Sequence, residues 1–64
     1  MIEKIKRLMD FTNMNQKQLA HKLGLTPVAV SRYLAGKRKP TIDFAVSVSN
    51  AFGVSLDWLL KEEY

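Results

Sequence analysis

Basic side chains are the most informative reactive groups in this sequence, and they are concentrated in its middle. Between Phe11 and Ile42 there are six Lys or Arg residues and no Asp or Glu, whereas the rest of the chain has four basic and six acidic residues. The six are Lys17, Lys22, Arg32, Lys37, Arg38 and Lys39. An acid-free basic stretch of this kind favours a polyanion such as nucleic acid as the partner. The alternative is a solvated basic surface that only keeps the protein soluble.

Residue types suited to catalysis or metal binding are scarce. The chain has no cysteine, so it has neither a disulfide nor a thiolate, and His21 is its only histidine. We recognise no nucleophile–base pair, no metal cluster and no phosphate-binding loop. We therefore expect a protein that is not an enzyme, with no catalytic residue, metal site, cofactor or small-molecule ligand, and we interpret His21 as a surface residue.

Length and composition predict one small domain over residues 1–64. The apolar content of 47% is ordinary for a folded globule and argues against disorder. No run of about 20 apolar residues is present, and charges are mixed from the first residues onward, so we expect neither a membrane span nor a signal peptide. The expected location is the cytoplasm, on nucleoid DNA.

Glycines and helix-capping residues divide the chain into five helical pieces. Apolar spacing predicts a first helix over about 2–11, with charged residues including Lys4 and Lys6 on its polar face. The next four begin after the N-cap residues Asn15, Thr26, Thr41 and Ser55 and extend over about 16–23, 27–35, 42–52 and 56–62. In the fourth piece the apolar residues also alternate as in a strand, but one strand would have no partner here, so helix is favoured.

The second and third pieces carry the signature of two short helices that cross steeply. Ala20 offers a small side chain at the crossing, Gly24 allows the tight turn, and Leu19, Leu23 and Val30 provide buried aliphatic contacts. Each feature is common alone, but together at these offsets they indicate a helix-turn-helix, whose second helix enters a DNA major groove.

At these residues the sequence resembles the phage-repressor/Cro-type (XRE-like) helix-turn-helix family. The motifs are Asn15-Gln16-Lys17-Gln18-Leu19-Ala20, Lys22-Leu23-Gly24-Leu25-Thr26, Val30-Ser31-Arg32-Tyr33, Gly36-Lys37-Arg38-Lys39-Pro40 and Gly53-Val54-Ser55-Leu56-Asp57-Trp58-Leu59-Leu60. The resemblance implies an all-α, compact five-helix lambda-repressor-like domain. It also implies a sequence-specific double-stranded DNA-binding transcriptional regulator, a repressor in our interpretation, that binds a palindromic operator as a homodimer.

The resemblance also implies two sets of DNA contacts. Phosphate contacts are expected from Gln16, Lys17, Lys37, Arg38 and Lys39. Base contacts are expected from Pro27, Val28, Ser31 and Arg32. The sequence departs from the family pattern at Pro27 and Val28, which offer no hydrogen-bond donor and at most touch a thymine methyl group. Arg32 is therefore the best reader of a base, most naturally guanine. A phosphate contact is the alternative for Arg32, and it is equally open for Ser31. A second departure is Leu34, where many relatives have Glu and a polar link to the first helix.

The dimer surface is expected outside the DNA-facing residues 16–40. The C-terminal stretch has more apolar side chains than one inner face of a short helix requires. We assign Leu56, Trp58, Leu60 and Tyr64 to a dimer interface, together with Phe44, whose alternative place is the core. The alternative for the whole set is that all pack inward and the chain dimerises only on DNA.

Two other functions remain open at this level. The first is a protein-interaction module of the same fold, such as an antitoxin or anti-repressor partner, with little DNA binding. Pro27 and Val28 favour it, and the six basic residues argue against it. The second is a membrane-surface peptide built on the first helix, which ranks lower because Glu3 and Asp10 lie on that helix.

Overall fold

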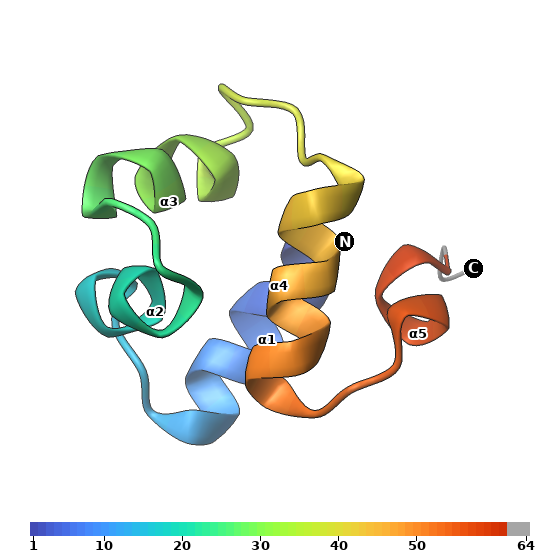
Figure 1. The fold of residues 1–64 in the computed structure, drawn as a ribbon. Helices are drawn as coiled ribbons and strands as arrows, with labels where there is room; N and C mark the ends of the chain where they lie inside the picture. The colour runs from blue at the N-terminus through green and yellow to red at the C-terminus, as the bar shows by residue number, and fades with distance from the viewer. Residues whose placement is uncertain (62–64) are drawn as a thin grey trace.

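Five α-helices form the fold of the computed structural model, which describes residues 1–61 (Figure 1). They are α1 (Ile2–Thr12), α2 (Gln16–Leu23), α3 (Pro27–Leu34), α4 (Ile42–Phe52) and α5 (Leu56–Leu60). The described residues contain no strand, so the expected all-α fold is confirmed and the ambiguous fourth piece is a helix. α5 is shorter than predicted because Lys61 leaves the helical conformation, with φ −72° and ψ 128°.

Side-chain caps start four of these helices where the sequence predicted them. Asn15 and Gln18 form a reciprocal capping box at α2, in which the Gln18 amide donates to Asn15 Oδ1 at 2.8 Å and the Asn15 amide donates to Gln18 Oε1 at 2.9 Å. The hydroxyls of Thr26, Thr41 and Ser55 cap α3, α4 and α5, each by accepting one hydrogen bond from a backbone amide of the first turn. Each cap stabilises its helix by roughly 1 kcal/mol relative to alanine.

The end of α1 differs from the prediction. The helix extends to Thr12, whose hydroxyl donates to the Leu8 carbonyl oxygen at 2.7 Å, and it stops at Asn13. Asn13 has φ 56° and ψ 42°, a left-handed conformation that asparagine tolerates better than most residues. The chain thus reverses into α2 without a glycine.

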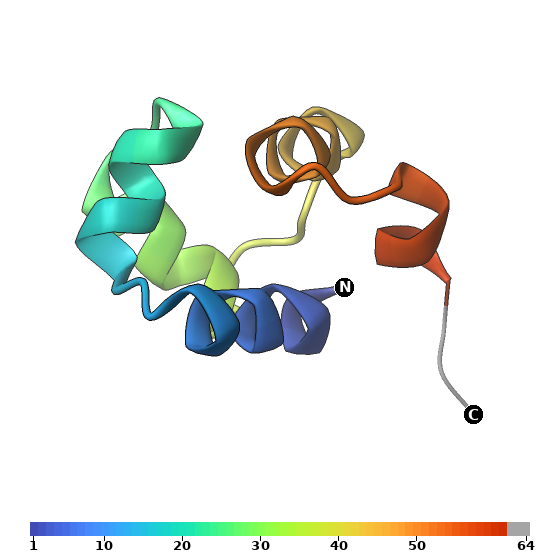
Figure 2. The ribbon, with the colours of Figure 1, turned by 90° about the horizontal axis from the view of Figure 1, so that it is seen from below.

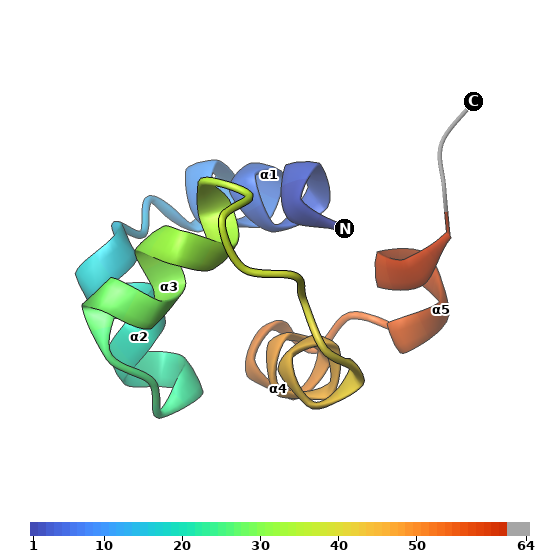
Figure 3. The same ribbon diagram turned by 90° about the horizontal axis from the view of Figure 1, so that it is seen from above.

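The core takes one large, fully buried aliphatic side chain from every helix. Ile5, Leu19, Val30, Val48 and Leu59 are each 0% exposed. Figures 2 and 3 show α2 and α3 at one end of the fold and α5 at the other, with α1 and α4 on opposite sides between them. Truncating one of these residues to alanine costs about 2–5 kcal/mol for Leu or Ile, since a cavity is left behind.

Phe44 lies in this core, which corrects its assignment to a dimer interface. Its side chain is 4% exposed, and its ring is stacked on that of Tyr33 with centroids 4.0 Å apart and an interplanar angle of 12°. A residue covered by its own subunit has no surface to offer a partner. Of the two places that the sequence left open for Phe44, the core is the one that it occupies.

Lys4 is also buried, although the sequence places it on the polar face of α1. Its side chain is 5% exposed, and its ammonium group donates to the carbonyl oxygens of Trp58 and Lys61 at the end of α5. The same group lies 5.1 Å from the centroid of the Trp58 ring. A cation at a helix C-terminus is favourable, so Lys4 attaches α5 to α1.

Candidate nucleic-acid interface

The crossing of α2 and α3 is built from the small and aliphatic residues that the sequence singled out. Ala20 is 1% exposed, and its carbonyl oxygen accepts a hydrogen bond from the Leu25 amide at 2.9 Å across the turn. Gly24 has φ 70°, a conformation that costs a side-chain-bearing residue more than it costs glycine. This turn holds the two helices against each other and leaves the outer side of α3 open to solvent (Figure 1).

An open hollow of about 490 Å³ on the outer side of α3 brings most of the predicted DNA contacts together. Its lining, called here the α3 hollow, consists of Gln16, Pro27, Val28, Ser31, Arg32, Ala35 and Lys37. All four predicted base contacts belong to it, as do the predicted phosphate contacts Gln16 and Lys37. The remaining predicted phosphate contacts, Lys17, Arg38 and Lys39, are exposed but do not line the hollow.

The reading face of α3 is partly apolar. Pro27 is the first helical residue, and Val28 is 60% exposed. Arg32 follows Val28 by four residues and therefore shares its face of the helix. This face offers methyl groups at its N-terminal end and hydrogen-bond donors one turn later, a pattern complementary to a thymine methyl beside a hydrogen-bonding base.

The N-terminus of α2 has two backbone amides available for an anion. A helix leaves its first amides without intrahelical acceptors. The capping box binds the amides of Asn15 and Gln18, so those of Gln16 and Lys17 remain at the helix tip. Such amides, with the positive end of the helix dipole, suit a phosphate oxygen.

The loop after α3 is held against that helix by backbone hydrogen bonds. Gly36 has φ 75°, and the amides of Lys37 and Arg38 both donate to the Arg32 carbonyl oxygen, at 3.0 and 3.3 Å. The Arg38 guanidinium carbon also lies 5.0 Å from the centroid of the Tyr33 ring. The cations of this loop are therefore presented from a fixed turn.

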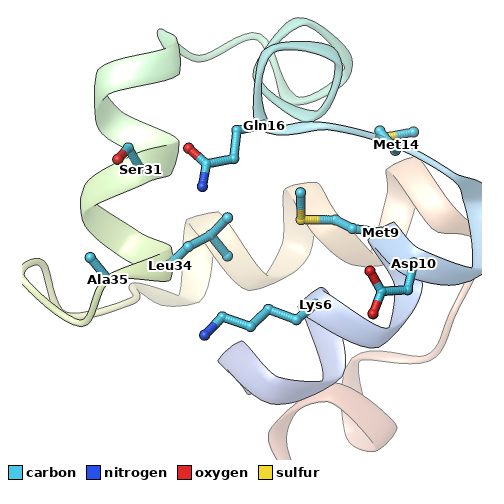
Figure 4. A pocket seen from close by; sticks show the side chains of 8 residues that line it. All are labelled: Lys6, Met9, Asp10, Met14, Gln16, Ser31, Leu34 and Ala35. Atoms are coloured by element: carbon cyan, nitrogen blue, oxygen red, sulfur yellow. The ribbon is translucent and has the colours of Figure 1, made fainter.

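A second hollow, of about 400 Å³, adjoins the first and extends the candidate interface onto α1 (Figure 4). It shares Gln16, Ser31 and Ala35 with the α3 hollow. Its other lining residues are Lys6, Met9, Asp10, Met14 and Leu34. We call it the α1–α3 hollow.

Lys6 is the residue that sequence reasoning missed at this interface. Its ammonium group lies 3.9 Å from Glu3, and the two side chains are 50% and 83% exposed, so their ion pair is weak. The sequence showed only that Lys6 lies on the polar face of α1. Lys6 lines the same hollow as Gln16 and Ser31, from the opposite side, because of the way α1 packs against α3 (Figure 4).

Leu34 occupies the floor of the α1–α3 hollow in place of the polar link expected in relatives. It is 8% exposed, and Met9 from α1 is 9% exposed in the same core cluster. The contact of α1 with α3 is therefore apolar here, and Asp10 lines the hollow at its edge (Figure 4).

Apolar side chains are exposed at the other end of the molecule. Trp58 and Leu60 of α5 are 38% and 44% exposed, and Leu56 is half-buried. Two residues of α4 that the sequence analysis did not single out are exposed as well, Ile42 at 63% and Val46 at 39%. Tyr64, assigned above to the dimer interface, lies outside the described residues.

Two other features bear on the possible partners. Within residues 1–61, no helix is long and apolar enough to cross a bilayer. The same residues include no group of three or more His, Asp or Glu side chains placed to hold a metal ion.

The sequence profile of the helix-turn-helix family matches residues 5–59, nearly the whole chain. Together with the fold, this match shows that the chain belongs to the XRE-type helix-turn-helix family. Membership confirms the resemblance, and it agrees with the expectation of a DNA-binding domain rather than an enzyme.

Curated relatives carry names of the same kind. The uncharacterized HTH-type transcriptional regulator YqaE of Bacillus subtilis is 38% identical over 61 residues, 95% of this chain and 53% of the relative. The SPbeta prophage-derived uncharacterized HTH-type transcriptional regulator YonR of B. subtilis is 34% identical, over 92% of this chain and 55% of the relative. The HTH-type transcriptional activator BcrR of Enterococcus faecalis is also 34% identical, over 95% of this chain and 30% of the relative.

The chain thus spans about half or less of the length of these relatives. No solved structure gives a significant match.

Proposed function

We propose that this protein is a sequence-specific double-stranded DNA-binding transcriptional regulator. The observation that carries the proposal is the α3 hollow. Four residues of α3, the tip of α2 and Lys37 from the loop after α3 surround this single concave surface. The names of the curated relatives support regulation of transcription as the purpose of this binding. Its place of action is then the DNA of the cytoplasm.

In the proposed complex, α3 lies in the major groove and its flanks contact the sugar–phosphate backbone. The amides at the tip of α2 and the Gln16 side chain bind one phosphate, and Lys37 and Arg38 bind others along the strand. Lys17 and Lys39 add charge beside them. These contacts position the protein and give affinity without sequence preference.

Sequence preference comes from three side chains of α3 in this proposal. Arg32 donates two hydrogen bonds to a guanine, Val28 packs against a thymine methyl group, and Ser31 binds a base edge between them. Pro27 provides only apolar contact. Because one bidentate pair is worth about 1–3 kcal/mol of discrimination, a single copy reads its site weakly.

Two copies on a palindromic operator would overcome this weakness. Helix-turn-helix dimers place their recognition helices about 34 Å apart, one turn of DNA. A two-fold interface uses the same patch on both subunits, and the exposed apolar residues of α4 and α5 lie away from the α3 hollow. We propose Leu56, Trp58 and Leu60 for that interface, with Ile42 and Val46 beside them. Repression follows if the operator overlaps a promoter.

Selection of bound sites from random duplexes tests the proposal. We expect a two-fold symmetric motif with about one DNA turn between half-site centres. The Lys37→Ala variant should then reduce the slope of log affinity against log salt by about 0.9, because one phosphate contact is lost.

Lys22→Ala is the matched control for this measurement. Lys22 is exposed in the last turn of α2 and lines neither hollow, so its slope should change less. Recovery of no motif, with binding only to a protein partner, would favour the interaction-module function. The exposed Val28 is the observation that supports that second candidate.

A further inference from the structure

Three side chains form a continuous stack from the core to the loop after α3. Phe44 of α4 is buried, and its ring lies parallel to that of Tyr33 with centroids 4.0 Å apart. The Arg38 guanidinium carbon lies over the Tyr33 ring, 5.0 Å from the centroid of that ring. Since Phe44 covers one face of the Tyr33 ring, the guanidinium covers the opposite face.

This stack places a basic group without using its hydrogen bonds. A guanidinium is planar and carries all its N–H donors in its own plane, so an aromatic ring against its face leaves those donors available. Arg38 is exposed to solvent, whereas Tyr33 is 5% exposed. The Tyr33 ring thus lies between the buried Phe44 ring and the exposed Arg38 guanidinium.

The backbone of the loop is held at the same point. The Arg38 amide donates to the Arg32 carbonyl oxygen at 3.3 Å, and Lys37 donates to that same oxygen at 3.0 Å. The main chain and the side chain of Arg38 are therefore both attached to α3. The adjacent Lys37 has its main chain attached in this way and lines the α3 hollow.

From this geometry we infer that Tyr33 is a positioning residue for DNA binding, which orients the Arg38 guanidinium toward a backbone phosphate before the DNA arrives. Tyr33 itself contacts no DNA. The gain is a smaller loss of side-chain entropy when the phosphate contact forms. The inference rests on the proposed function and adds to it a residue of the buried face of α3.

A double-mutant cycle on duplex binding tests the inference. The probe is a fixed duplex with the selected motif, or any duplex of matched length for non-specific binding. Tyr33→Leu removes the ring and keeps an apolar side chain. A cation–π contact at an exposed site is worth about 0.5–1 kcal/mol, so we expect Tyr33→Leu to weaken binding about 2- to 5-fold. In an Arg38→Gln background the same substitution should have no further effect, because there is no guanidinium to orient.

The conservative variant and a spectroscopic signal separate positioning from folding. Tyr33→Phe keeps the stacking face and should bind DNA like the parent protein. The side-chain protons of Arg38 should show ring-current shifts in the free parent protein and in Tyr33→Phe, and lose them in Tyr33→Leu. Thermal melts identify a temperature at which all variants are folded, and binding is compared there.

The outcomes distinguish the positioning role of Tyr33 from the proposed DNA-binding function. An equal loss from Tyr33→Leu in both Arg38 backgrounds would overturn the positioning role, as would unchanged binding in Arg38→Gln. Both results would leave the proposed function standing, provided that the parent protein and Lys37→Ala behave as described above. A parent protein that binds no duplex at low salt would remove the proposed function and this inference together.

Discussion

The two ends of this molecule have opposite surfaces, although both are built from short capped helices. The end formed by α2, α3 and the following loop exposes Gln16, Arg32 and Lys37 around the α3 hollow, in a stretch without a single acid. The end formed by α4 and α5 exposes Ile42, Trp58 and Leu60 and carries the acids Asp43 and Asp57. In Figures 2 and 3, α5 lies at the end opposite α2 and α3, and α4 extends from it toward the middle of the fold, across from α1.

The difference shows how a chain of 64 residues separates two kinds of binding. A basic surface attracts a polyanion over a long range, and salt screens this electrostatic attraction. Contacts of an apolar surface are not weakened by this screening, and they stabilise a complex in proportion to the buried area. Because the two surfaces lie at opposite ends, a copy of the chain docked at α5 does not cover the α3 hollow. Variants that damage one end and spare the other can test this separation.

Leu60→Asp, at the α4–α5 end, should have the largest effect of the variants, and the effect is on self-association. It places a charge in the proposed dimer surface, where a central apolar contact is worth about 2 kcal/mol or more. We expect self-association to weaken by roughly 30-fold or more, operator binding to weaken with it, and helicity to remain.

Sedimentation of the free protein and footprints on one or two half-sites measure these effects. Phe11→Asp is the control for self-association, because Phe11 is 90% exposed on α1, apart from the α4–α5 end. Tight binding of a monomer to an isolated half-site would show that the dimer surface is not needed.

Ala20→Leu should destabilise the DNA-facing end by overpacking the crossing of α2 and α3. The side chain is 1% exposed, and forcing added methyl groups into a packed site costs about 1–3 kcal/mol. Thermal denaturation measures the loss. Ala35→Leu is the control at an exposed position of the same region, and a melt of Ala20→Leu equal to that of the parent would refute the assigned crossing.

Arg32→Ala should distinguish base contacts from phosphate contacts within the DNA-facing end. We expect preference at one base-pair position to relax by about 1–3 kcal/mol, since the proposed bidentate contact of Arg32 to a base would be lost. Binding to a panel of duplexes that differ at single positions measures it. A uniform loss of affinity across the panel would reassign Arg32 to a phosphate.

Substitutions on α1 should give the smallest effects and show how far the basic surface extends. Lys6→Gln should reduce the salt slope by up to about 0.9 if Lys6 reaches a phosphate beside the α1–α3 hollow. Asp10→Asn should strengthen binding by less than about 1 kcal/mol, because it removes one exposed like charge near the phosphates. The affinity of each variant and of the parent protein is measured over a range of salt concentrations. Equal slopes of log affinity against log salt for Lys6→Gln, Asp10→Asn and the parent would limit the interface to α2, α3 and the loop after α3.

Local chemistry let the sequence alone determine where α2 to α5 begin and where the turn between α2 and α3 lies. The capping box of Asn15 and Gln18, the hydroxyl cap of Thr26 and the positive φ of Gly24 each depend on residues within four positions of one another. Interactions of such short range are present in the residue order itself. The grouping of Pro27, Val28, Ser31 and Arg32 follows for the same reason, since all four lie on one helix.

Only the tertiary structure decided where Phe44, Lys4 and Lys6 lie. The periodicity of α4 left Phe44 between core and surface until Tyr33 of α3 was found stacked on it. Lys4 is buried because the carbonyl oxygens of Trp58 and Lys61, more than 50 residues away, accept its hydrogen bonds. Lys6 faces the α1–α3 hollow because of the way α1 packs against α3. Burial and neighbourhood depend on contacts between helices distant in sequence, and the pattern within one helix identifies its apolar stripe but not the helix that covers it.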